Sequence, residues 1–151
     1  MRIVVEKSTH LLTLLEDEVV VLRCQIALGR NGQARKQLQG DCATPEGVYR
    51  ICLVKEQGKY GRSLGLSYPN QQDAALALKQ GHITQETYQA IADAQQHNRR
   101  PPWGTALGGE IYLHEGDTAT DWTQGCIAVS PQNMQLIFSH WEKIYSVEIR
   151  R

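Results

Sequence analysis

The chain has 151 residues, and its 16 basic and 16 acidic side chains cancel to a formal net charge of zero. This length suits a single domain over residues 1–151 that buries a core without covalent staples. Neither sign of charge forms a long block, which argues against a nucleic-acid partner, and the longest apolar runs are too short to span a bilayer.

Alternating apolar residues make the N-terminal third rich in predicted strands. We expect one strand from Arg2, one near Leu11 and, after a turn at Glu16–Glu18, one that runs through Leu28. The polar, glycine-punctuated segment Gly29–Asp41 predicts an exposed loop.

Further along the chain, a turn at Pro45 and Gly47 predicts the start of a strand over Val48–Val54. From Asp73 to Asn98 alanine, glutamine and leucine dominate, which predicts a helical insertion over about 73–98, made of two short helices split at Gly81. Thr84 is the expected N-cap of the second helix.

The C-terminal third returns to strands after the paired prolines of "RRPPWG" end any helix. The segment "EIYLHE" reads as a strand, and Ser130 followed by Pro131 predicts the cap and first residue of a helix. A last strand, "SVEI", closes the chain.

No charged start, apolar stretch and small-residue cleavage site is visible in the first residues. We therefore expect a cytoplasmic protein if the chain is complete, and a periplasmic or envelope protein if an export signal was trimmed.

The four cysteines, Cys24, Cys42, Cys52 and Cys126, form no CxxC pair and no zinc-type spacing with the five histidines, so no metal site is predicted. Apolar neighbours make Cys24 and Cys52 candidates for packed core thiols.

Cys126 has a second interpretation, as a nucleophile. It follows Gly125, whose backbone can turn unusually and expose amides beside the sulfur. His114, at the end of the preceding strand, lies close enough in sequence for a loop to bring an imidazole to the thiol, which would help it ionise. The residues alone leave both interpretations open, a packed thiol and a cysteine acyl-transfer enzyme.

The sequence resembles the YkuD-type L,D-transpeptidase catalytic domain, whose motif is a histidine followed by Ser/Thr, a variable residue, Gly and Cys. Here these are His114 and then Thr123-Gln124-Gly125-Cys126. "KSTHLLTLL" and "GDCATPEGVYRI" match other parts of the family, and "SYPNQQD" and "PPWGTALGGEIYLHE" resemble its YafK-like branch. The resemblance implies a mainly β fold, a β-sandwich with helical insertions, of the α+β class.

The resemblance also implies a mechanism. Cys126 would be the nucleophile and His114 its base, the Glu115 carbonyl would orient the imidazole, and amides around Gln124, Gly125 and Cys126 would form the oxyanion hole. The expected reaction is acyl transfer through a thioester on peptidoglycan stem peptides, with no metal or organic cofactor and with carbapenems as inhibitors.

The chain departs from the common family pattern at three positions. Gln124 stands where histidine is frequent, Ala128 where arginine is frequent, and Glu115 where glycine is frequent. The missing arginine leaves donor specificity open. The Glu115 carboxylate either favours the imidazolium or faces solvent, and we expect it to face solvent.

Four other residues are tentative contacts to substrate: Trp103, Trp122, Thr123 and Tyr68. The tryptophans would either wall a groove or pack in the core. We also expect side chains of Asp121 and Thr123 to hold the cysteine loop through bonds to the backbone.

Three alternatives to transpeptidation remain. One is hydrolysis, as an L,D-carboxypeptidase or an amidase that cleaves bonds to diaminopimelate, including murein-protein links. Another is a non-catalytic wall-binding module in which Cys126 is only packed. The third is a cytoplasmic cysteine hydrolase that acts on imported murein peptides.

Overall fold

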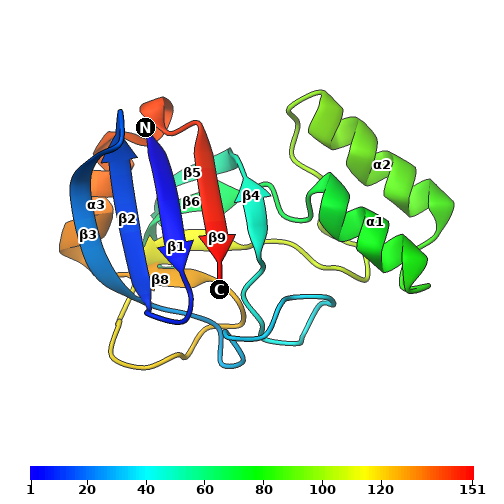
Figure 1. Ribbon diagram of the computed structural model, residues 1–151, viewed down its shortest axis with the longest axis horizontal. Helices are drawn as coiled ribbons and strands as arrows, with labels where there is room; N and C mark the ends of the chain where they lie inside the picture. The colour runs from blue at the N-terminus through cyan, green and yellow to red at the C-terminus, as the bar shows by residue number, and fades with distance from the viewer.

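The computed structural model describes residues 1–151 and contains one nine-stranded sheet and three α-helices (Figure 1). The strands are β1 (Arg2–Glu6), β2 (Leu11–Glu16), β3 (Val19–Ala27), β4 (Gly47–Tyr49), β5 (Ile51–Gly58), β6 (Gly61–Leu66), β7 (Tyr112–Glu115), β8 (Ile127–Val129) and β9 (Ser146–Arg150). The helices are α1 (Gln71–Lys79), α2 (Gln85–Gln96) and α3 (Pro131–Ser139), with a 3₁₀ turn at Trp141–Lys143. The predicted mainly β fold is confirmed.

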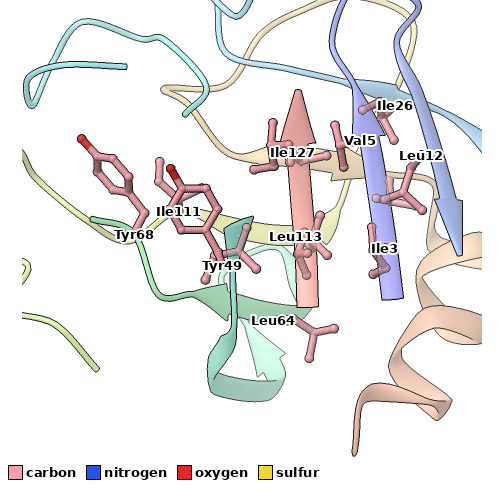
Figure 2. Packing of buried hydrophobic residues seen from close by; sticks show 14 of the residues in the cluster. Ile3, Val5, Leu12, Ile26, Tyr49, Leu64, Tyr68, Ile111, Leu113 and Ile127 are labelled. Atoms are coloured by element: carbon pink, nitrogen blue, oxygen red, sulfur yellow. The ribbon is translucent and has the colours of Figure 1, made fainter. Parts of the chain in front are cut away.

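The sheet is continuous in the order β4-β9-β1-β2-β3-β8-β7-β6-β5. The long strand β3 joins its two halves, because residues 19–25 pair with β2 whereas Ile26 and Ala27 pair with β8. Side chains from both halves meet in one apolar cluster (Figure 2): Ile3, Val5, Leu12, Leu64, Leu113 and Ile127. The two halves therefore pack face to face, as in a sandwich.

The predicted single strand over Val48–Val54 is wrong. The chain leaves one half of the sheet at Arg50, so that β4 pairs with β9 and β5 pairs with β6 at the opposite edge. At this corner Ser67 holds the Arg50 backbone on both sides: its hydroxyl accepts from the Arg50 amide and its amide donates to the Arg50 carbonyl, each at 2.9 Å. Strand-forming residues continue through the corner, which is why the sequence does not reveal it.

Helices α1 and α2 form a pair that projects from the β4 side of the sheet (Figure 1). Thr84 caps α2 as predicted, through a bond from the Thr87 amide, and the break lies at Gly81. α1 begins before the expected Asp73, because Asn70 is its N-cap and forms a reciprocal capping box with Asp73.

The predicted cap at Ser130 and first residue at Pro131 of α3 are confirmed, and this helix buries Met134 and Ile137 completely. Two arrangements were not predicted: β6 forms a hairpin with β5, and β9 pairs in parallel with β1 between β1 and β4. None of the helices has the length and apolar character that crossing a membrane requires.

Candidate active site

A cavity of about 750 Å³ opens beside β7 and β8, and both His114 and Cys126 line it. We call it the Cys126 cavity. Its walls come from the 30–42 loop, the β5–β6 hairpin and the 103–112 and 122–126 segments. The structure therefore brings together the two residues that the sequence singled out.

The parallel pairing of β7 and β8 sets how the two side chains face. Leu113 lies opposite Ile127 and both are fully buried in the core, whereas His114 lies opposite Ala128. Residues two apart on a strand point to the same side, so Cys126, just before β8, shares the face of Ala128 and His114. The thiol and the imidazole thus lie diagonally on one face of neighbouring strands.

The His114 ring is fixed by one hydrogen bond and two aromatic neighbours. Its Nδ1 lies 2.8 Å from the Glu115 carbonyl oxygen, an acceptor, so Nδ1 carries the proton and Nε2 is left with its lone pair. Tyr60 stacks on the ring at a centroid distance of 4.6 Å, and Trp122 meets it edge-on at 5.7 Å. Burial lowers the pKa of His114 below 6.5, so the ring is neutral near pH 7 and can accept a proton.

The Cys126 thiol is protonated in this environment. Its sulfur donates to the Glu110 carbonyl, 3.3 Å away, and accepts from the Tyr112 amide at 3.4 Å. Burial raises the pKa of Cys126 above 9.0, and the Tyr112 amide offsets only part of this rise. The sequence suggested a thiol that ionises beside its histidine, whereas the resting pair in the structure is neutral.

The loop before Cys126 is held by side chains, as expected for Thr123. The Thr123 hydroxyl donates to the Cys126 carbonyl at 2.7 Å and accepts from the Gly125 amide at 3.1 Å. Asp121 accepts from the Leu28 amide at 2.8 Å, which ties the start of the loop to the end of β3. His10 binds the other Asp121 oxygen at 2.8 Å.

These bonds change the expected oxyanion donors. The Gly125 amide is already used by Thr123, whereas the amides of Gln124 and Cys126 have no acceptor in the protein. Gly125 contributes its conformation instead: its φ is +136°, and a Cβ there would lie 2.7 Å from the Ala43 carbonyl oxygen. The amides of Gln124 and Cys126 are therefore the candidate donors to a developing oxyanion.

Neither expected role of the Glu115 carboxylate is found. It points away from the His114 side of the strand and forms an ion pair with Arg62 at 2.7 Å, with only 18% of its side chain exposed. Gly61 leaves the room for this, since a Cβ there would collide with the Glu115 carboxylate. The expectation of a solvent-facing carboxylate is therefore wrong.

The tentative substrate contacts have different outcomes. Tyr68 is fully buried and donates to the Leu107 carbonyl at 3.0 Å, so its expected place at the site is wrong. Trp103, Trp122 and Thr123 line the Cys126 cavity. Trp103 also packs edge-on against Tyr112 at a centroid distance of 5.9 Å, so it both packs and faces the cavity.

Sequence reasoning missed most of the cavity lining, including Tyr60, Lys55, Glu110 and Tyr112. Tyr60 follows Gly58 and precedes Gly61, a spacing typical of a hairpin turn, and this was the one available signal. The 29–41 loop was expected to be exposed, yet its Lys36 is 6% exposed and lines the cavity.

All four cysteines are free. Cys24 is buried, and burial raises its pKa to about 11, as expected for a packed thiol. Cys52 is only half-buried, and Cys42 lies at the wall of the Cys126 cavity. No group of three His, Cys, Asp or Glu side chains is placed to hold a metal ion.

The family model for the L,D-transpeptidase catalytic domain, YkuD, matches residues 1–149 of the chain. No curated protein sequence matches the chain.

Among solved structures, the helical cell shape determining protein Pgp2 from Campylobacter jejuni is 19% identical over 99% of this chain and 46% of its own, with a TM-score of 0.66. L,D-transpeptidase 1 from Mycobacterium tuberculosis is 13% identical over 98% of this chain and 60% of its own, with a TM-score of 0.52. The LD transpeptidase LdtMt1 in complex with imipenem is 12% identical over 98% of this chain and 57% of its own, with a TM-score of 0.52. At these identities the likeness shows the fold, and the chain spans about half the length of the structures it matches.

Proposed function

Because this chain belongs to the L,D-transpeptidase (YkuD) catalytic-domain family, we propose that it transfers acyl groups of peptidoglycan stem peptides through a thioester on Cys126. The observation that carries the proposal is the position of His114 and Cys126 on one face of the sheet, in one cavity, with free amides beside the sulfur. The family match supports the reaction class, and the site geometry supports the assignment of residues.

In the proposed first step, the Cys126 sulfur attacks the carbonyl carbon of the stem peptide while Nε2 of His114 takes the thiol proton. The carbonyl π electrons move to oxygen, and the Gln124 and Cys126 amides donate to the resulting oxyanion. When the carbon–nitrogen bond breaks, the imidazolium returns its proton to the leaving amine and the thioester remains.

In the second step an amine of another stem, or water, attacks the thioester carbonyl and the thiolate leaves. His114 removes the proton from the attacking group and returns a proton to the sulfur. An amine gives a cross-link, whereas water gives a trimmed stem, so transfer and hydrolysis share the whole active site and differ only in the acceptor.

The test is to incubate the protein with purified muropeptides whose tetrapeptide stems carry diaminopimelate, and to measure the masses of the products by mass spectrometry. We expect cross-linked dimers or stems shortened by one residue with the wild type, and neither with Cys126→Ala. Dimers indicate transfer and shortened stems indicate hydrolysis. If the folded wild type leaves the muropeptides unchanged, the enzyme assignment fails and a wall-binding module becomes the better explanation.

A further inference from the structure

We propose that Lys55 and the Tyr112 hydroxyl form a carboxylate-binding subsite beside Cys126, which favours donor peptides with a free carboxylate near the bond to be broken. This inference deepens the proposed function and rests on it. It concerns which peptide is held at the cavity, and three features of the cavity wall support it.

The first feature is an excess of unpaired positive charge. The cationic residues that line the Cys126 cavity are Arg30, Lys36, Lys55 and Lys59, and Glu110 is the one acidic residue among the lining. Lys36 is already bound, to Asp41 at 3.0 Å and to the Leu38 carbonyl at 3.1 Å. The other three cations form no ion pair with the protein, so the cavity offers positive charge to an anionic ligand.

The second feature is the register of the sheet, which puts Lys55 in line with the catalytic histidine candidate. Lys55 on β5 lies opposite Ser63 on β6, which lies opposite His114 on β7. Directly opposed residues share a face, so the Lys55 ammonium and the imidazole project to the same side. Two strand spacings separate their backbones by about 10 Å. The lysine side chain reaches across part of this distance, and about one residue of a bound peptide would span the rest.

The third feature is Tyr112, which connects the ammonium to the sulfur. The Lys55 Nζ lies 5.0 Å from the centre of the Tyr112 ring, and the Tyr112 backbone amide donates to the Cys126 sulfur at 3.4 Å. Gly65 makes room for the ring, because a Cβ there would approach Tyr112 Cε1 to 3.1 Å. The ring therefore lies across β6, between Lys55 and Cys126.

The Tyr112 hydroxyl is the one buried side-chain polar atom of the protein without a hydrogen-bond partner. A buried hydroxyl without a partner is destabilising, and native proteins satisfy nearly all such groups. Its oxygen is buried in the unliganded protein, so a ligand oxygen would satisfy it once the ring turns the hydroxyl into the cavity. A phenol donor and an ammonium on the same wall can serve the two oxygens of a carboxylate.

Two of the carboxylates of a stem tetrapeptide flank the bond to be broken, that of the leaving terminal residue and that of the diaminopimelate side chain. The experiment separates them with three probes: a stem tetrapeptide with both carboxylates free, one with the terminal carboxylate as an amide, and one with the diaminopimelate carboxylate as an amide. Binding is measured by calorimetry to the Cys126→Ala protein, so that no probe is consumed.

We expect one of the two amides to bind about tenfold or more weakly than the free peptide, the loss typical of a charge-assisted hydrogen bond. Adding Lys55→Met should weaken binding of the free peptide by a similar factor, so that the free peptide no longer binds more tightly than that amide. Tyr112→Phe should act in the same direction with a smaller effect. Lys79→Met, which removes the same charge from the end of α1 outside the cavity, should change none of the three affinities.

The proposal is overturned if Lys55→Met weakens all three probes equally, if it weakens none, or if no probe binds the parent protein. Because binding is read without turnover, this failure is distinct from failure of the proposed function, which appears as unchanged muropeptides. If the wild type forms products and yet free and amidated peptides bind equally, the proposed function stands and the proposed subsite does not.

Discussion

Replacing His114 with alanine is expected to slow acylation of Cys126 by about 10²–10⁴-fold near pH 7, the range typical of losing a general base. The reason is the protonation state of the thiol. Its pKa is raised by burial, so with no acceptor for its proton the sulfur remains a weak nucleophile. The measurement is a time course of adduct formation with a carbapenem, followed by intact mass at a series of pH values.

The pH profile distinguishes a base from a residue that only shapes the cavity. In the wild type the rate should be level between the lowered pKa of His114, below 6.5, and the raised pKa of Cys126, above 9.0. It should fall on the acid side, where His114 gains a proton and can no longer accept one. In His114→Ala the rate should rise about tenfold per pH unit across the same interval, because only the thiolate formed by solvent reacts.

The matched control is His82→Ala, an exposed histidine in the turn between α1 and α2, which should keep the wild-type rate and profile. A level profile in His114→Ala, or a rate near that of the wild type, would show that His114 is not the base.

Replacing Gly125 with alanine is expected to destabilise the protein by about 1–3 kcal/mol and to lower turnover at least about a hundredfold. The glycine has a φ of +136°, a region that other residues avoid, and an added Cβ would press on the Ala43 carbonyl oxygen at 2.7 Å. To relieve this contact the loop must shift, and the sulfur and the free amides shift with it. Thermal unfolding and the muropeptide assay measure the two effects.

Gly81→Ala separates the loss of stability caused by a positive φ from the effect on the active site. Gly81 also has a positive φ, +77°, but nothing lies within 4 Å of the added Cβ, and the residue lies between α1 and α2 away from the cavity. We expect a modest loss of stability with unchanged turnover. If Gly125→Ala behaved like Gly81→Ala in the turnover assay, the geometry of the Cys126 loop would not be what positions the thiol.

The candidate nucleophile and base could be found from the sequence because both lie in a short, recognisable stretch. The spacing from His114 to Cys126 is local, and the caps at Thr84 and Ser130 likewise depend on neighbouring residues. Such signals can be read from the sequence because the residues that interact are close along the chain.

The rest of the site could not be predicted, because it depends on the order of strands in the sheet. Lys55 reaches the cavity only because β5 pairs with β6 and β6 with β7, and Tyr60 reaches His114 through the turn of the same hairpin. Arg62 pairs with Glu115 across the sheet, a contact with no trace in the local sequence. The protonation states also follow from burial, which only the tertiary structure determines.

The most direct test of the proposed thioester is to incubate the protein with imipenem and locate the bound mass by peptide mapping. A β-lactam is suited to this purpose because opening its ring leaves the amine attached to the acyl group on the sulfur. We predict one adduct, on Cys126, that is absent from Cys126→Ser, while Cys24, Cys42 and Cys52 stay unmodified. An adduct on any of those three cysteines, or none on the folded wild type, would contradict the assignment of Cys126 as the nucleophile.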